Sequence, residues 1–254
     1  MKSRWVQYSW IAMLIIGMML ITGCVIQVGD YEVQVGDPEV FEVGELRHEV
    51  HSVPYQDFDT YRVEILMGFG ELDVEAGSRE LLDAEFTYNV DEWAPEVVLE
   101  SVDGEGTLIV RQTFEGVTAS SGARNGWSLQ LNDEIPTDLN VKLGAGENNL
   151  DLVGLQLTNL DIEMGAGELN LDLSGDWSRD FSAVLTRGVG EATILLPSEA
   201  GVRVTITSGI GTVVGLGLER QGDAYVNEAY GESDVTIMLD IVGAVGSIDL
   251  EVVE

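Results

Sequence analysis

The two histidines of the chain have a spacing that could hold a metal ion. His48 and His51 form an H-x-x-H pair within the segment ELRHEVHSV. Catalytic zinc needs a third protein ligand and a general base, and the helical H-E-x-x-H signature is absent from the sequence. In a strand, positions three apart point to opposite faces. We therefore predict that these histidines are an exposed polar pair, and we expect no cofactor.

Four glutamates that each follow a glycine could act together on a cation. Glu71, Glu147, Glu168 and Glu191 occupy the same place in four similar segments, so stacking of those segments would form an acidic ladder. Carboxylate oxygens suit calcium. The nonapeptide calcium repeat, however, has glycine where Glu147 stands and aspartate where Asn149 stands. We favour solvated charges that keep sheets from associating, with calcium binding as the alternative.

Covalent catalysis has no candidate nucleophile. The sequence has no G-x-S-x-G elbow, and its only cysteine is Cys24. Some of the 45 acidic residues must lie close together, which leaves glycoside chemistry open. No acid, base and nucleophile can be assembled into one site, so we predict that the protein is not an enzyme.

The N-terminus has the features of a secretory signal peptide. Lys2 and Arg4 precede an uncharged apolar run from Trp10 to Ile21. That run is short for a membrane-spanning helix and is typical of the central region of a signal peptide. We predict a lipoprotein signal peptide over residues 1–23.

The end of this run indicates a lipid anchor. Ile21, Thr22, Gly23 and Cys24 resemble the bacterial lipobox, in which small residues precede an invariant cysteine. Leucine is usual where Ile21 stands. The resemblance implies that Cys24 is diacylated and becomes the mature N-terminus, which would hold the protein on the outer side of a bacterial membrane. A buried structural cysteine is the alternative.

Composition excludes several classes of protein. The chain has 254 residues, 45% of them hydrophobic, which is enough apolar content for a folded core. Its formal charge of −33 opposes binding to nucleic acid. The 30 glycines have no three-residue period, so collagen is excluded, and one cysteine cannot form a disulfide framework.

Residues 24–44 are predicted to be an acidic tether. The sequence QVGD occurs at 27–30 and again at 34–37, and Pro38 and several glycines oppose a helix. Alternating Val, Tyr and polar residues leave an early edge strand as the alternative.

The rest of the chain is dominated by six segments in which a glycine-rich corner precedes alternating apolar residues. Four neighbouring copies are spaced by 21 to 23 residues, which indicates stacked repeats. The last corner glycines are Gly70, Gly146, Gly167, Gly190, Gly211 and Gly246.

The alternation changes phase at each corner glycine. Apolar residues lie at odd offsets before Gly146, as at Val141, and at even offsets after it, as at Leu150. A strand can keep one face buried through such a slip only by bending or bulging, which glycine permits. We therefore predict an all-β, stacked-strand β-solenoid, with two short strands per glycine corner. A β-sandwich is the alternative. The predicted regions are an N-terminal β region (45–136) and C-terminal solenoid repeats (137–254), and the only weak helix candidate is 78–86.

Three tryptophans could either stack on sugar rings or fill the ends of the stack. Trp93, Trp127 and Trp177 lie beyond the signal peptide. Large aromatic residues are mostly buried by packing, so we favour a capping role.

The layout of these segments resembles the toast-rack family of bacterial surface proteins. The resemblance extends over residues 45–254 and rests on segments such as MGFGELDV, FTYNVDEWAPEV, LGAGENNLDL and MGAGELNLDL. The C-terminal half is similar to the extracytoplasmic domain of LiaF-type envelope stress regulators and to β-helical adhesins. The resemblance implies stacked β-strands and no active-site residues. The several transmembrane helices of LiaF-type regulators are missing, which argues against a direct regulatory role.

Together these features predict a lipid-anchored, extracytoplasmic, non-catalytic interaction or adhesion module with a link to envelope stress. Its partners would be the membrane, through the lipid, and an envelope protein or cell-wall polymer. The alternative is a surface lipoprotein that binds a glycan or calcium at a small-ligand site.

Overall fold

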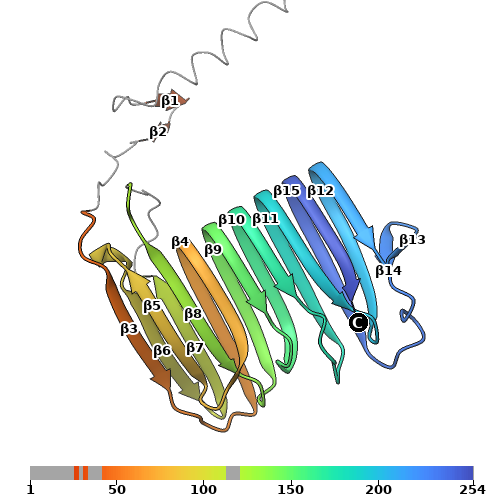
Figure 1. Cartoon of the computed structure of the whole chain (residues 1–254), viewed down its shortest axis with the longest axis horizontal. Helices are drawn as coiled ribbons and strands as arrows, with labels where there is room; N and C mark the ends of the chain where they lie inside the picture. Colours follow the sequence, from red (N-terminus) through yellow and green to blue (C-terminus); the bar gives the residue numbers. More distant parts are fainter. Residues whose placement is uncertain (1–25, 29–30, 34–41, 113–120, 254) are drawn as a thin grey trace, which may run out of the picture. The chain divides into compact units, whose positions relative to one another are not determined.

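The computed structural model describes residues 26–28, 31–33, 42–112 and 121–253, and β-strands dominate them (Figure 1). The one helix in these ranges is the 3-10 turn η1 (Asp91–Trp93), and no helix there is long and apolar enough to cross a membrane. The predicted signal peptide and lipobox, with Cys24, lie outside the described residues. The chain divides into Met1–Val40 and Phe41–Glu254.

The first unit contains one described hairpin. Strands β1 (Ile26–Val28) and β2 (Tyr31–Val33) pair antiparallel, with Ile26 opposite Val33. Part of the segment predicted to be a tether is therefore a short hairpin.

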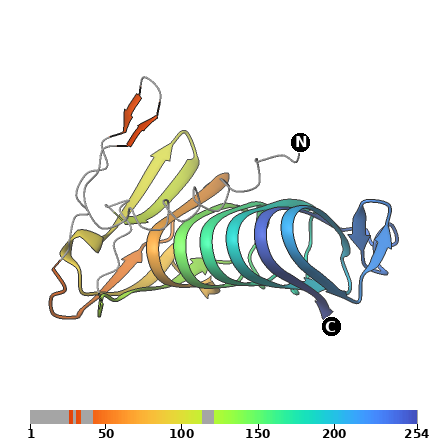
Figure 2. The same cartoon turned by 90° about the horizontal axis from the view of Figure 1, so that it is seen from above.

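Six long strands form the body of the second unit. Each of them bends in its middle, so that in Figure 2 the strands appear as a row of hoops. We call the parts of a hoop before and after its bend its first and second arms, and neighbouring hoops pair in parallel along both arms. In spatial order they are β4 (Thr60–Ser78), β9 (Thr137–Asp151), β10 (Leu157–Asp172), β11 (Phe181–Pro197), β15 (Thr236–Val253) and β12 (Gly201–Leu216).

The order of the hoops departs from the order of the sequence at one end. Strand β15 lies between β11 and β12, so Gly246 is placed between Gly190 and Gly211. The long interval between Gly211 and Gly246 contains the hairpin β13 (Glu219–Gln221) and β14 (Ala224–Val226), which extends the sheet beyond β12.

Short strands extend the two arms of β4 separately at the other end. Strand β7 pairs with the first arm of β4, over Thr60–Leu66, and β8 pairs with the second arm, from Glu71. The short strands there are β3 (Arg47–Val53), β5 (Leu82–Tyr88), β6 (Pro95–Val102), β7 (Glu105–Gln112) and β8 (Asn125–Asn132).

The core lies between the two arms of the hoops. In β10, Ile162 and Met164 are buried before the bend and Leu169 and Leu171 after it, which is the predicted change of phase around Gly167. Full burial of each such side chain contributes about 1.5–3 kcal/mol. The buried residues of all six hoops form one continuous cluster.

The predicted all-β stacked architecture is confirmed, with two differences in detail. Each repeat is one continuous strand that bends at its glycine, and not two separate short strands. The weak helix candidate at 78–86 is mainly the strand β5. The first repeat, on β4, pairs directly with β9, and both lie in the single unit Phe41–Glu254. The division of the chain at residue 136 into an N-terminal β region and solenoid repeats stays a prediction.

Candidate interaction surface along the glycine corner

The corner glycines of the six hoops lie side by side in one ladder. In spatial order they are Gly70, Gly146, Gly167, Gly190, Gly246 and Gly211. A Cβ on Gly167 would lie 1.9 Å from the carbonyl oxygen of Gly146, and one on Gly246 would lie 1.7 Å from that of Gly190. Gly167 also has a φ of +122°. No other residue fits such a position without a shift of the neighbouring backbone.

A second glycine ladder runs two residues earlier along the same strands. It consists of Gly68, Gly144, Gly165 and Gly188 on β4, β9, β10 and β11. A Cβ on Gly144 would lie 2.1 Å from the carbonyl oxygen of Gly68, and one on Gly188 would lie 2.2 Å from that of Gly165. In each of these four strands, a single residue at the corner therefore lies between two glycines, so the backbone on either side of it carries no side chain.

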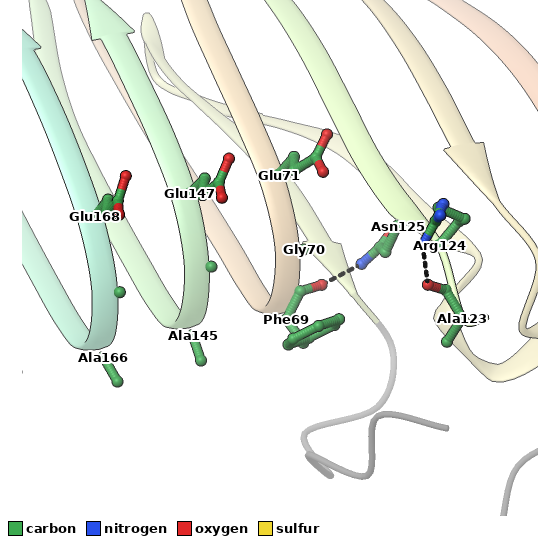
Figure 3. Close-up of a pocket in the computed structure, with 12 residues that line it drawn as sticks. Phe69, Gly70, Glu71, Ala123, Arg124, Asn125, Ala145, Glu147, Ala166 and Glu168 are labelled. Atoms are coloured by element: carbon green, nitrogen blue, oxygen red, sulfur yellow. Dashed lines mark hydrogen bonds between the residues drawn. The ribbon is translucent and has the colours of Figure 1, made fainter. Parts of the chain in front are cut away.

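That middle residue forms an apolar ridge along the outside of the bend, which we call the corner ridge. Figure 3 shows Phe69, Ala145 and Ala166 projecting from it. Farther along the stack Val189 is 54% exposed and Ile210 is 76% exposed. The complete corner ridge, in spatial order, is Phe69, Ala145, Ala166, Val189, Val245 and Ile210.

A groove follows each side of the corner ridge. One groove, of about 430 Å³, has the corner glycines as its floor and reaches Arg124 at one end (Figure 3). The other, of about 680 Å³, follows the second glycine ladder between Arg111 and Thr186, with Lys142 on its wall. Both grooves are open to solvent, and the glycines that line them leave backbone accessible, which suits contact with an extended partner.

The predicted acidic ladder is present beside the first groove. Glu71, Glu147, Glu168 and Glu191 are direct partners on consecutive parallel strands. Figure 3 shows the first three of them. Next to them Asn149 Nδ2 donates to Asp73 Oδ1 at 2.9 Å, and Asn170 Nδ2 donates to Asn149 Oδ1 at 2.8 Å. Within the described ranges, no group of three or more His, Cys, Asp or Glu side chains is arranged to hold a metal ion.

Neutralising the middle of this ladder is expected to stabilise the protein. Like charges directly opposite each other on neighbouring strands are destabilising, so Glu147→Gln with Glu168→Gln should raise the free energy of unfolding by about 0.5–1 kcal/mol. Urea denaturation at low salt measures this gain, which should shrink at high salt as the charges are screened. Glu85→Gln is the control, because Glu85 faces Val50 and Ser128 on its neighbouring strands. A loss of stability in the double variant at low salt would contradict the prediction.

Side-chain amides complete the corner at the β4 end, where no further hoop follows. Gln112, at the end of β7, accepts through Oε1 from Gly68 N at 3.1 Å. Asn125, at the start of β8, donates through Nδ2 to the carbonyl oxygen of Phe69 at 2.6 Å and to Gln112 Oε1 at 3.2 Å. The two amides thus make the hydrogen bonds to the β4 corner that the backbone of a further hoop would make. We call Gln112 and Asn125 the amide cap.

A buried arginine supports the corner farther along. Arg187 is 4% exposed, and its guanidinium donates to the carbonyl oxygens of Ser247 and Gly190, both at 2.9 Å. It occupies space left by Gly243, whose Cβ would lie 3.5 Å from Arg187 Cγ. Burial lowers the pKa of the Arg187 guanidinium, and no salt bridge to it is found among the described residues. Its role is to hold β11 and β15 together at the bend.

The two histidines lie on β3, far from the corner ridge in the sheet order. His48 is exposed, with Nδ1 3.4 Å from Thr87 Oγ1, whereas His51 is half-buried and packs edge-on against Phe86. His51 Nε2 lies 3.4 Å from a carboxylate oxygen of Glu49. A hydrogen bond from the Tyr88 hydroxyl lowers the pKa of that carboxyl group. The two histidines have separate partners, and no metal-binding group of side chains in the described part of the chain includes them.

The tryptophans are divided between two places. Trp127 and Trp93 are buried at the end of the stack near β8 and η1, where Trp93 packs on Phe69, so they act there as the predicted cap. Trp177 lies in the connection between β10 and β11, in the middle of the stack. Its ring packs on Phe181 at an angle of 53°, and its indole nitrogen donates to the carbonyl oxygen of Leu173 at 2.8 Å. The capping prediction is wrong for Trp177, because this residue lies in the connection between two inner hoops and not at an end of the stack.

Sequence reasoning missed the amide cap and Arg187. Neither stands out, since Gln112 and Asn125 are ordinary polar residues at the ends of strands and Arg187 follows the alternation of β11 at an inward position. The polar residue at an inward position was the available signal for Arg187. Of the predicted site residues, Ile21, Thr22, Gly23 and Cys24 lie outside the described ranges.

Comparison with known proteins identifies a family and similar solved structures. A family model described as the N-terminal domain of toast_rack, DUF2154, matches residues 42–195. The crystal structure of a candidate cell adhesion protein from Clostridium sporogenes has 31% sequence identity and a TM-score of 0.79, covering 82% of this chain and 100% of that chain. No curated protein matches.

A more distant match is a candidate adhesin from Bacteroides fragilis. It has 8% identity and a TM-score of 0.26, covering 82% of this chain and 97% of that one. A similarity this weak carries no argument about function.

Proposed function

The chain belongs to the family of the N-terminal domain of toast_rack, and we propose that it is a non-catalytic adhesion module, anchored by lipid on the outer side of a bacterial membrane. The similarity to the Clostridium sporogenes protein carries the proposal, because it extends over the whole of that chain at 31% identity. That protein is described as a candidate in cell adhesion.

The geometry of the corner suits adhesion better than catalysis. The corner ridge presents Val189, Val245 and Ile210 to solvent, and two open grooves flank its other part, on β4, β9 and β10. Exposed apolar residues in a row with a polar border are typical of interaction surfaces. A catalytic site would place an acid, a base and a nucleophile within reach of one another in a cleft, and neither groove has that arrangement.

Anchoring depends on Cys24, whose lipobox context supports diacylation. Two acyl chains hold a protein stably on a bilayer, whereas one gives only reversible binding. The negative charge would keep the adhesive domain away from anionic envelope polymers, so the partner should meet the uncharged corner ridge. We further propose that an envelope protein bound at this ridge links the module to the envelope stress response.

In-cell crosslinking followed by mass spectrometry tests the function. The native chain should capture a defined envelope protein or wall polymer, Cys24→Ala should lose it with the anchor, and Val189→Asp with Val245→Asp should lose it while the protein stays at the surface. Arg62→Ala is a matched surface control, because Arg62 pairs with Asp138 on the outer face away from the corner. Capture that is unchanged in all variants would overturn the proposed function.

A further inference from the structure

The two ends of the stack of hoops are finished differently. At the β4 end, the amide cap of Gln112 and Asn125 bonds the last corner. At the other end β12 is the last hoop, and β14 covers only Arg203–Thr205 of its outer edge. Among the described residues, positions 206–216 of β12 pair with β15 alone, so their other edge is free. We call this stretch the distal edge.

The distal edge lacks the usual protection of an exposed strand. Natural edge strands are guarded by charged residues, which prevent pairing with other chains. Strand β12 has no acidic residue, whereas the other five hoops each have at least one. Three apolar side chains on the distal edge are exposed: Ile210 (76%), Leu216 (57%) and Val214 (43%). A chain with a net charge of −33 therefore keeps one strand edge both free and uncharged.

We propose that the distal edge is a homophilic docking site, which pairs antiparallel with the distal edge of a second copy of this chain. This inference rests on the proposed adhesive function and adds a second copy of the chain as a partner at the distal edge. The free stretch extends equally to both sides of Gly211, so a two-fold axis at Gly211 brings the two edges into full overlap. In that register Ile210 of one copy lies opposite Thr212 of the other. Such a contact is self-complementary and closes as a dimer.

Charge and capping both favour a second copy over other arrangements. An acidic partner strand would be repelled by the many carboxylates on the neighbouring hoops, whereas another β12 brings no acid to the contact. Head-to-tail stacking, which would build a fibre, is blocked because the corner at the β4 end already has its partners in Gln112 and Asn125. Only the distal ends can meet.

This arrangement suits adhesion between two membranes. The chain enters the unit beside β3, and β12 lies eight strand-to-strand steps away, or about 38 Å at the usual strand spacing. Pairing through β12 puts the two entry points at the outer ends of the dimer, so each copy can be anchored in its own bilayer. A contact along one strand edge is weak for a single pair, and many copies on one membrane strengthen it through multivalency.

Vesicle clustering tests the proposal. The lipidated full-length protein is placed on two vesicle populations with different dyes, and their co-clustering is counted. Clustering should require the protein on both populations and should increase with salt, which screens the acidic flanks. Ile210→Glu on both populations, or Thr212→Lys on both, should reduce clustering at least tenfold, and mixing one population of each should restore it. Val102→Glu, at an exposed position at the end of β6, should leave clustering unchanged.

The remaining outcomes separate the inference from the proposed function. Clustering with protein on one population alone, or no rescue on mixing the two charge variants, overturns the homophilic edge. Vesicles that never cluster, from a protein that still captures an envelope partner in cells, overturn the edge and leave the adhesive function standing. Analytical ultracentrifugation of Cys24→Ser gives the same test without the anchor, since Ile210→Glu should abolish a concentration-dependent dimer. Circular dichroism confirms that each variant is folded.

Discussion

Gly167→Ala is expected to prevent stable folding of the stack. The new Cβ would lie 1.9 Å from the carbonyl oxygen of Gly146, and the φ of +122° is one that alanine rarely adopts. Gly167 lies in the middle of the ladder, between Gly146 and Gly190, so neither neighbouring strand can move aside without breaking its own pairing. We expect a loss of more than about 4 kcal/mol, measured by urea denaturation followed by circular dichroism.

Gly126→Ala is the matched control for this substitution. Gly126 lies in β8, and a Cβ there has nothing within 4 Å. It should leave stability unchanged or raise it by about 0.4–1 kcal/mol, since alanine reduces the freedom of the unfolded chain. If Gly167→Ala unfolded at the same urea concentration as Gly126→Ala, the claim that the corner strands are too close to admit a Cβ at Gly167 would be wrong.

Asn125→Ala should have the second largest effect, with a loss of about 2–4 kcal/mol. The Asn125 side chain is buried, and its amide serves Phe69, Gln112 and, through Oδ1, the indole nitrogen of Trp127 at 3.1 Å. Its removal leaves the partly buried carbonyl of Phe69 and the buried indole N–H of Trp127 without these bonds, and each such group costs about 1–3 kcal/mol. Thermal and urea denaturation measure the loss.

Gln112→Ala tests whether the two amides act as one cap. It should cost about 1–3 kcal/mol, because Gly68 N loses its acceptor. Since the two side chains share a hydrogen bond, the double variant should lose less than the sum of the single losses. Gln130→Ala, at an exposed position of β8, should change stability by less than about 0.5 kcal/mol. Strict additivity would show that the two amides act independently.

The architecture could be predicted because its cause is local in the sequence. The change of phase around Gly146 and Gly167 is visible within ten residues on either side, and burial of one face forces the bend there. The same regularity predicts that Glu147 and Glu168 become neighbours, since equal spacing places equal positions side by side. Stacking, bending and the acidic ladder therefore follow from the sequence by itself.

The ends of the stack and the order of its last hoops were decided only by tertiary structure. The insertion of β15 between β11 and β12 could not be predicted from the repeat pattern, because the pattern of apolar residues within one segment does not specify which segment lies next to it. Gln112 and Arg187 acquire their roles through partners 44 and 60 residues away, at Gly68 and Ser247. The edge of β12 likewise is free at positions 206–216 because, among the described residues, β14 returns to cover only Arg203–Thr205. Periodicity specifies how one hoop fits the next, whereas contacts between distant residues determine where the row begins and where it stops.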